Sequence, residues 1–380
     1  MATYLGDQLG ADLTIVDGDH VYGVVYNVGR LYVPSAAWFY VNLYNGTDRG
    51  QAEIHCRDCY IAGTFSANAA GYYGYESGGG GPGGETKSHG GYTGGRGGGR
   101  DGAAAASPSG TAQCDCTGLG CGGASGPAGV DAGFIGNGPY PGTGGAPGAG
   151  GSNGSPGGPG GKGGYGANDL NGDMTTDKTI RMGSGGGAGA GAGGCGGATG
   201  TCNGCGGGGA PGGASGGRGG GLVAIYATNS MRVPGNIFTK GGLGLNGTAG
   251  NGWYDSRHGR PGAAGANRTD GQSTGLGGAA VMGANPSCGY GSTRYTGRGG
   301  DSGPGAGGGT LLCCTGPYGI VVDGVIDTRG GGDDVVNFGS LKVFGPRGRV
   351  TITGSIYAGH NSVYGAPLNS QTEVFQHVCC

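Results

Sequence analysis

Charged side chains are scarce in this sequence. Asp, Glu, Lys and Arg make up 12% of the 380 residues, and the formal net charge is −2. A protein without an excess of Lys and Arg has little with which to neutralise phosphates, so we expect no nucleic-acid partner. The charge content is also too low for a typical highly charged disordered protein. No apolar run approaches the roughly 18 residues of a membrane helix, so we expect no membrane insertion.

The N-terminal pattern also leads us to expect no secretion signal. The N-terminal residues 1–7 contain neither a basic segment nor an apolar segment of the signal-peptide type. The chain nevertheless has 13 cysteines, and disulfide-rich proteins normally belong to oxidising compartments. Many cysteines without a secretion signal are consistent with release by cell lysis. A virion component is made in the reducing host cytoplasm and is oxidised after release. The alternative is a mature secreted chain whose signal has been removed.

The cysteine count is odd, so at least one thiol is free or pairs with another chain. Neighbouring cysteines bridge each other poorly because their Cα atoms lie only about 3.8 Å apart. In a strand they also point to opposite faces. We therefore expect interchain disulfides at the two adjacent pairs: Cys313, Cys314, Cys379 and Cys380. For Cys379 and Cys380 the alternative is two free surface thiols. Intrachain disulfides are expected at the other cysteines: Cys56, Cys59, Cys114, Cys116, Cys121, Cys195, Cys202, Cys205 and Cys288.

Catalytic and metal-binding motifs carry little weight in glycine-rich sequence. Residues 213–217 fit G-x-S-x-G but lack the strand and helix that a nucleophile elbow needs. Cys56-x-x-Cys59 and Cys202-x-x-Cys205 are 143 residues apart, too far for paired zinc knuckles. In a strand, Cys56 and Cys59 would also face opposite sides. We expect no enzyme, no cofactor and no metal site.

Residues 1–70 have the pattern of short β-strands. Four segments rich in aromatic and β-branched residues indicate strands: Leu13–Val16, Val21–Tyr26, Leu31–Val33 and Trp38–Tyr44. Asp17-Gly18-Asp19 interrupts them and Asn45-Gly46 marks a turn. We expect an N-terminal β domain that serves for attachment.

A seven-residue motif, apolar-x-Gly-x-apolar-x-small, occurs four times. The copies are Ile61–Ala67, Val233–Thr239, Val322–Thr328 and Ile352–Ala358. An alternating strand is predicted before each copy: Ala52–Cys56, Leu222–Tyr226, Leu311–Cys314 and Val350–Ile352. A strand, a bend at glycine and a second strand are typical of one coil of a β-solenoid or of stacked β modules. Because the intervals are irregular, glycine-rich insertions must leave the stack between copies.

Glycine supplies 109 of the 380 residues and dominates residues 71–221. From Gly142 through Gly166 it occupies every third position, which places a bare edge on a helix with three residues per turn. Collagen and a bundle of polyglycine-II helices both use such an edge. The register shifts around residues 189–191, which collagen tolerates poorly and short bundled helices tolerate well. A disordered linker is the remaining alternative.

Tyrosines accompany the glycines and are candidates for surface contact, because their rings are rigid and amphipathic. The alternative is that they shield the glycine layer from water. The candidates are Tyr72, Tyr73, Tyr75, Tyr92, Tyr140 and Tyr165.

Taken together, the triplets from Gly142 to Gly166, the N-terminus and the β modules around glycine loops resemble the glycine-rich structural proteins of tailed-phage virions. The resemblance implies an all-β fold with irregular glycine-rich structure: β-solenoid-like or stacked β modules with polyglycine-II-type insertions. The expected regions are residues 1–70, the insertion 71–221, β modules in 222–365 and a cysteine-bearing tail, 366–380.

The resemblance also implies a function and a location. The expected role is a collar, neck-appendage or fibre component of the virion, homo-oligomeric (a trimer would fit) and joined to other virion proteins by disulfides. One alternative is a receptor-binding adhesin that contacts a host surface glycan or protein. A second is a glycine-rich cell-surface or matrix protein, which glycans at Asn45 or Asn246 would favour. The 13 cysteines depart from the adhesin pattern.

Overall fold

The computed structural model describes residues 2–74, 178–187, 216–244, 252–253, 294–295, 302–332, 338–346 and 348–358. Within these ranges the chain is all-β, and none of its elements is a helix. The strands are β1 (Thr3–Asp7), β2 (Leu13–Thr14), β3 (Asp19–Val33), β4 (Trp38–Val41), β5 (Gln51–Ile61), β6 (Thr64–Ser66), β7 (Leu222–Val233), β8 (Asn236–Phe238), β9 (Gly252–Trp253), β10 (Arg294–Tyr295), β11 (Thr310–Cys314), β12 (Gly319–Val322), β13 (Val325–Asp327), β14 (Leu341–Phe344), β15 (Val350–Ile352) and β16 (Ser355–Tyr357).

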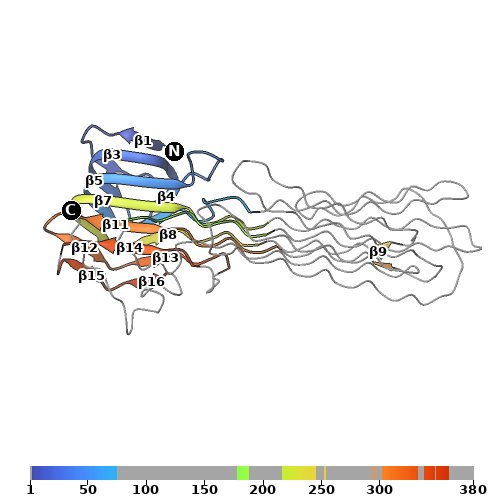
Figure 1. Cartoon of the computed structure of the whole chain (residues 1–380). Coiled ribbons are helices and arrows are strands. Elements are labelled where there is room, and N and C mark those ends of the chain that lie inside the picture. Colours follow the sequence, from blue (N-terminus) through green and yellow to red (C-terminus); the bar gives the residue numbers. More distant parts are fainter. Residues whose placement is uncertain are drawn as a thin grey trace, which may run out of the picture.

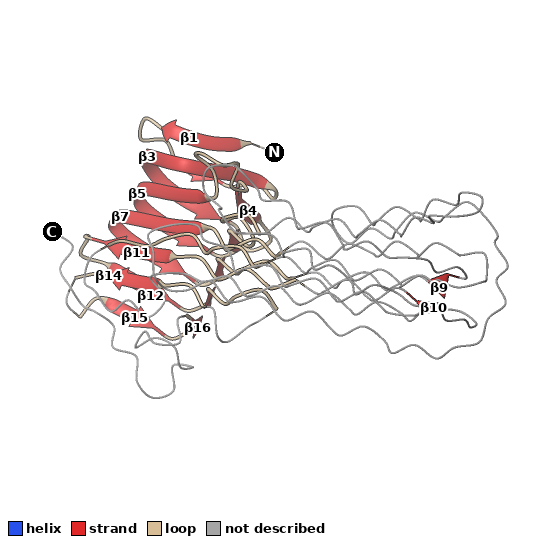
Figure 2. Cartoon of the chain, turned by 45° about the vertical axis from the view of Figure 1, so that its right-hand side comes forward, coloured by secondary structure: helices blue, strands red, loops and turns tan. Residues whose placement is uncertain are grey.

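Fourteen of these strands form one parallel sheet that curls back on itself (Figure 1, Figure 2). Its order runs β14-β11-β7-β5-β3 and returns through β4-β6-β8-β13-β16. We distinguish three rows of parallel strands. The first row contains β1, β3, β5, β7, β11 and β14; the middle row contains β2, β3, β5, β7, β12 and β15; the third row contains β4, β6, β8, β13 and β16.

The long strands β3, β5 and β7 each take part in two rows because they bend. The pairing of β3 with β5 shifts register between Val25 and Val28, and the pairing of β5 with β7 shifts between Cys56 and Asp58. Such an irregularity lets a strand turn a corner and re-aim its side chains. Strands β11 and β12 occupy the same two rows as separate strands, with residues 315–318 between them.

The four copies of the sequence motif are neighbours in this sheet. Phe65 pairs with Ile237, Ile237 with Ile326, and Ile326 with Ile356, so the second apolar residue of every copy lies in one column. All four side chains are buried. The preceding strands predicted at Ala52–Cys56, Leu222–Tyr226, Leu311–Cys314 and Val350–Ile352 are confirmed as parts of β5, β7, β11 and β15.

The motif glycine lies at the bend between the middle and third rows. The Asn236 N–H donates to the Gly63 carbonyl at 2.8 Å, and the Val325 N–H donates to the Gly235 carbonyl at 3.0 Å. A Cβ added at Gly235 or Gly324 would overlap the carbonyl oxygen of the glycine in the preceding copy. Close backbone approach between copies therefore requires glycine here.

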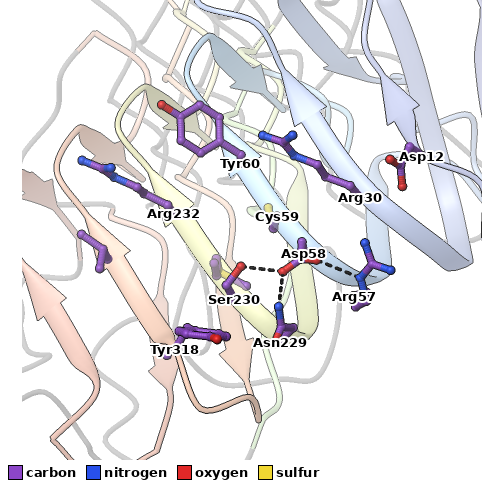
Figure 3. Close-up of a pocket in the computed structure, with 13 residues that line it drawn as sticks. Asp12, Arg30, Arg57, Asp58, Cys59, Tyr60, Asn229, Ser230, Arg232 and Tyr318 are labelled. Atoms are coloured by element: carbon purple, nitrogen blue, oxygen red, sulfur yellow. Dashed lines mark hydrogen bonds and ion pairs between the residues drawn. The ribbon is translucent and has the colours of Figure 1, made fainter.

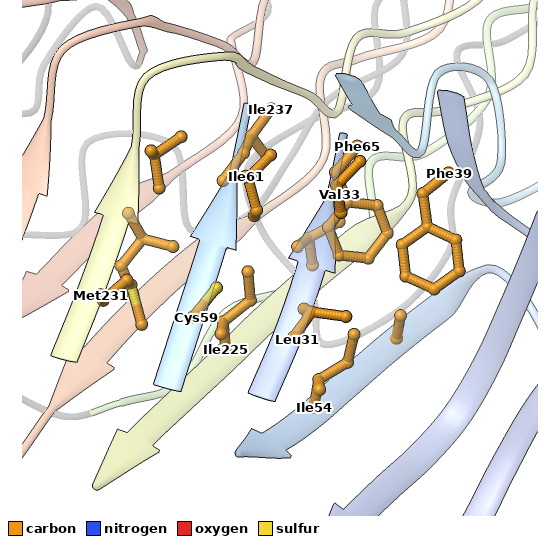
Figure 4. Packing of buried hydrophobic residues seen from close by; sticks show 14 of the residues in the cluster. Leu31, Val33, Phe39, Ile54, Cys59, Ile61, Phe65, Ile225, Met231 and Ile237 are labelled. Atoms are coloured by element: carbon orange, nitrogen blue, oxygen red, sulfur yellow. The ribbon is translucent and has the colours of Figure 1, made fainter. Parts of the chain in front are cut away.

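One hydrophobic core fills the interior of the curled sheet (Figure 4). Phe39 stacks on Phe65 with ring centroids 4.7 Å apart. Ile61 and Ile237 lie beside this pair, and Ile225 lies among the same buried side chains. Because β5 pairs with β7, the N-terminal residues and the modules after residue 221 share both the sheet and this core.

Glycine-rich segments next to the third row pack against one another without forming strands (Figure 1). We call them the glycine bundle. Its segments are residues 71–74, 183–187, 216–221, 239–244, 302–309 and 329–332.

Three segments of the glycine bundle are joined by a closed cycle of backbone hydrogen bonds. The Gly183 N–H donates to the Gly220 carbonyl (2.9 Å), and the Gly220 N–H donates to the Ala306 carbonyl (2.8 Å). The Ala306 N–H closes the cycle on the Ser184 carbonyl at 2.9 Å.

The same cycle recurs three residues away in each of the three segments, toward the C-terminus in residues 183–187 and toward the N-terminus in the other two. Its bonds run from Gly186 to Gly217, from Gly217 to Gly303, and from Gly303 to Gly187, at 2.8, 2.9 and 2.9 Å. The hydrogen bonding of the bundle therefore repeats every third residue in these segments.

Several strands differ from the sequence-based expectation. Strands β1, β9, β10, β12 and β14 were not predicted, and Val21–Tyr26 and Leu31–Val33 belong to one continuous strand, β3. The triplet segment from Gly142 to Gly166, most of the insertion and the tail 366–380 lie outside the described residues.

Candidate functional site

A groove of about 680 Å³ lies on the outer face of the middle row (Figure 3). We call it the outer groove. It is lined by Asp12, Arg30, Arg57, Asp58, Cys59, Tyr60, Asn229, Ser230, Met231, Arg232, Tyr318, Gly319 and Val321.

The alternation of each strand sends polar side chains into the outer groove. After its bend, β5 exposes Asp58 and Tyr60 in part and buries Cys59. In β7, Ser230 and Arg232 face outward and Met231 is buried. Since successive side chains of a strand point to opposite faces, the bend fixes which residues reach the groove.

Asp58 is the centre of a hydrogen-bond network in the outer groove (Figure 3). Its carboxylate accepts hydrogen bonds from Ser230 Oγ at 2.6 Å, Asn229 Nδ2 at 2.7 Å and Arg57 Nε at 2.9 Å. Partial burial opposes ionisation, but hydrogen bonds from Ser230, Arg57 and Asn229 outweigh it and lower the pKa of Asp58. Asp58 is therefore an ionised acceptor at neutral pH and unsuited to general-acid catalysis.

Arginines and tyrosines form the rest of the outer groove. Arg30 lies over Tyr32 and Tyr60, with Cζ 5.1 and 5.9 Å from the two ring centroids. The rings of Tyr32 and Tyr60 are 5.7 Å apart. Arg232 forms an ion pair with Asp323 at 3.0 Å. Guanidinium groups beside aromatic rings suit a polar ligand that carries both apolar faces and negative charge.

Cys56 and Cys59 are both buried and carry free thiols. The expectation that they face opposite sides of a strand is wrong, because the irregularity at Cys56–Asp58 turns both side chains inward. The Cys56 thiol contacts the Tyr226 carbonyl at 3.6 Å. The hydrogen bond between the two thiols and the burial of Cys59 raise the pKa of Cys59.

Cys313 and Cys314 are also buried, on opposite faces of β11, as expected for adjacent residues of a strand. Cys313 packs with Leu311 and Phe344 on the outer face, whereas Cys314 lies in the main core. The Cys314 thiol is free and fully buried, so it can bridge a second chain only after local opening. The other nine predicted disulfide positions lie outside the described residues: Cys114, Cys116, Cys121, Cys195, Cys202, Cys205, Cys288, Cys379 and Cys380.

Tyr72 and Tyr73 pack against the glycine bundle and are half-buried. The ring centroid of Tyr44 lies 5.1 Å from that of Tyr72 and 5.6 Å from that of Tyr73. Arg218 lies over Tyr73 at 4.4 Å. These contacts fit shielding of the bundle. The remaining candidates, Tyr75, Tyr92, Tyr140 and Tyr165, lie outside the described residues.

Asn45 is exposed, but its side chain is engaged locally. Its amide Nδ2 donates to Asp48 at 2.9 Å, and its Oδ1 accepts from the Thr47 N–H at 3.1 Å. In the described part of the chain, no group of three or more His, Cys, Asp or Glu side chains is placed to hold a metal ion. The same residues include no helix suited to crossing a membrane.

The residues of the outer groove were not among the predicted site residues. The sequence does contain a pattern that could have identified them: polar side chains alternate just before the motif copies. Counting back from the first apolar residue of a copy, positions −1 and −3 are Tyr60 and Asp58 in one copy and Arg232 and Ser230 in the next. Register then places these side chains next to each other.

The described residues define an all-β protein built on a curled parallel sheet, with a polar groove on its outer face. Comparison with protein-family models, with curated proteins and with solved structures gives no match.

Proposed function

We propose that the chain is a structural component of a tailed-phage virion, with a β-solenoid-like scaffold that carries a polyglycine-II bundle. The observation that carries the proposal is the continuity of the two parts. The glycine bundle begins directly where the third row ends: Thr239 follows β8, and its carbonyl accepts a hydrogen bond from the Gly308 N–H of the bundle at 2.7 Å. A scaffold cross-linked in this way resists bending, which suits a mechanical role.

Polyglycine-II packing is supported by the three-residue period of the hydrogen bonds. A left-handed helix with three residues per turn presents the same edge to the same neighbour every third residue. The cycles at Gly183-Gly220-Ala306 and at Gly186-Gly217-Gly303 have this spacing. Parallel and antiparallel segments can both hydrogen-bond in such a bundle, because each backbone N–H and each carbonyl needs only one partner.

Attachment to other virion proteins is proposed for the N-terminal region and for Cys379 and Cys380. Most of the exposed large apolar side chains of the described residues lie in the first 43 residues: Leu5, Leu9, Val16, Val24, Tyr26, Trp38 and Leu43. Exposed large apolar residues are candidates for contact with another protein.

Immunoelectron microscopy tests the virion assignment. An antibody against the purified full chain is applied to phage particles released by lysis of the source culture. We expect label at a neck, collar or fibre. On non-reducing gels we expect a disulfide-linked product of higher mass, which a reducing agent separates into its chains. Label confined to the cell wall or the medium would overturn the virion assignment in favour of the cell-surface or matrix alternative.

A receptor-binding adhesin is the second candidate, and the outer groove is the observation that favours it. Tyr318 at its margin is 70% exposed. In this case the isolated chain binds intact host cells and competes with phage adsorption. A purely structural component does neither, so an adsorption assay with added protein separates the two functions.

A further inference from the structure

We propose that the outer groove binds an acidic oligosaccharide, a linear sugar chain that carries carboxylates. A mechanical role needs no such ligand, so this inference goes beyond the proposed structural function and stands without it. The argument rests on the free cation, the aromatic surfaces, the remaining hydrogen-bond acceptors and the size of the groove.

Arg30 is the cation that a ligand carboxylate would meet. Two other arginines line the groove, but Arg57 is bonded to Asp58 and Arg232 is paired with Asp323. Arg30 contacts the tyrosine rings, and among the described residues no carboxylate lies within ion-pair distance of it. A guanidinium without a carboxylate partner keeps its N–H groups available for bidentate bonds to a ligand carboxylate.

Tyr60 and Tyr318 provide the apolar surfaces that the C–H faces of sugar rings pack against. Tyr60 stands in the groove beside Arg30, and Tyr318 lies across the groove and is largely exposed (Figure 3). Gly319, next to Tyr318, also lines the groove. Rigid amphipathic rings bind such faces at a low cost in conformational entropy.

Sugar hydroxyls would find acceptors and donors around Asp58. Asn229 and Ser230 donate to the carboxylate, so the Asn229 carbonyl oxygen and the Ser230 hydroxyl lone pairs remain as acceptors. The volume of about 680 Å³ lies within the ordinary range of ligand sites. A polyphosphate would need many more cations than the groove offers, since Arg57 and Arg232 are already paired with aspartates.

Isothermal titration calorimetry on the full-length chain tests the proposal. The probes are trigalacturonate and a trimer of sialic acid, with neutral galactotriose as the uncharged comparison. We expect binding of at least one acidic trimer at least tenfold tighter than the neutral one, since a bond to a charged group is about that strong. Arg30→Gln should weaken acidic binding about tenfold, and Tyr318→Ala should weaken both acidic and neutral binding severalfold.

Arg49→Gln is the matched control. Arg49 lies over Tyr22 at 5.2 Å, nearly the same arrangement as Arg30 over Tyr32, but outside the groove. Unchanged binding of the acidic trimers by this variant supports the outer groove as their binding site. Failure of both acidic trimers to bind the wild-type chain, equal binding of the neutral trimer, or equal loss in both arginine variants would overturn the proposal. None of these results bears on the labelling of virions, so the structural function is tested separately.

Discussion

Cys56 and Cys59 lie three residues apart on strand β5, yet both side chains point into the hydrophobic core. The bend between Cys56 and Asp58 adds the half-turn that an unbroken strand would lack. Cys314 joins them in the same core from β11. The interior of the sheet therefore holds three buried free thiols.

Thiol labelling should separate these cysteines from accessible ones. Because the thiolate is the reactive form and burial raises the pKa of Cys314, while the Cys56 hydrogen bond and burial raise that of Cys59, both react slowly in the folded protein. We expect N-ethylmaleimide to leave Cys56, Cys59 and Cys314 unmodified until denaturant is added. Peptide mass mapping of native and denatured samples checks this. Rapid labelling of the native protein at these positions would contradict their burial.

The same thiols predict a loss of stability at alkaline pH. A pKa that is raised in the folded state favours the protonated form there, so stability is complete below the ordinary thiol pKa of about 8.5 and falls as pH rises above it. Urea unfolding at pH 7 and pH 10 measures the change. A Cys59→Ala, Cys314→Ala variant should be less stable at pH 7 but lose less between the two pH values. An equal loss in wild type and variant would assign the effect to other groups.

Gly324→Ala should disrupt the stack at the motif bend. The added Cβ would overlap the Gly235 carbonyl oxygen, so neighbouring strands must separate, which costs about 3 kcal/mol. Gly46→Ala is the control: Gly46 has a φ of +99° but open space around it, so only the backbone cost of about 1–2 kcal/mol applies. Chemical unfolding compares the two. A Gly324 variant no less stable than the Gly46 variant would show that the strands are not in close contact here.

Gly220→Ala should open the glycine bundle and leave the β-sheet folded. An added Cβ would overlap the Thr239 carbonyl oxygen and break the cycle through Gly183 and Ala306. Hydrogen exchange should then become faster at these glycine-bundle amides while β5 and β7 stay protected. Ala306→Gly is the matched control, because it removes a Cβ from the same cycle and should preserve protection.

Asp19 should make the N-terminal strand acid-sensitive. Burial opposes its ionisation, but hydrogen bonds from the Ala2 and Val16 N–H groups and the Tyr4 hydroxyl outweigh this and lower the pKa of Asp19. Its contribution is therefore present above the ordinary pKa of about 3.9 and is lost as pH falls below it.

Asp19→Asn should cost about 1–3 kcal/mol at pH 7 and flatten the acid limb of the stability curve, measured by urea unfolding between pH 2 and pH 7. Asp12→Asn is the control, because no described residue donates a hydrogen bond to the Asp12 carboxylate. An unchanged acid limb in the Asp19 variant would locate the sensitivity elsewhere.

Much of the β architecture follows from local pattern. The motif copies around Gly63, Gly235, Gly324 and Gly354 were recognisable because backbone contact between copies excludes every side chain but hydrogen at that position. Period-two alternation predicted the strands before them. Strand β14 is only four residues long, is not followed by a copy of the motif, and was missed for that reason.

The amino-acid sequence alone determined that the chain is β-rich and which residues repeat from copy to copy, including the motif glycine. Tertiary structure decided the bends of β3, β5 and β7, which set side-chain direction after residues 25, 56 and 227. It also decided that β5 pairs with β7 across a long insertion and that Arg30, Asp58 and Tyr318 meet in one groove. Register between strands distant in sequence depends on the fit of the whole core, so no local pattern encodes it.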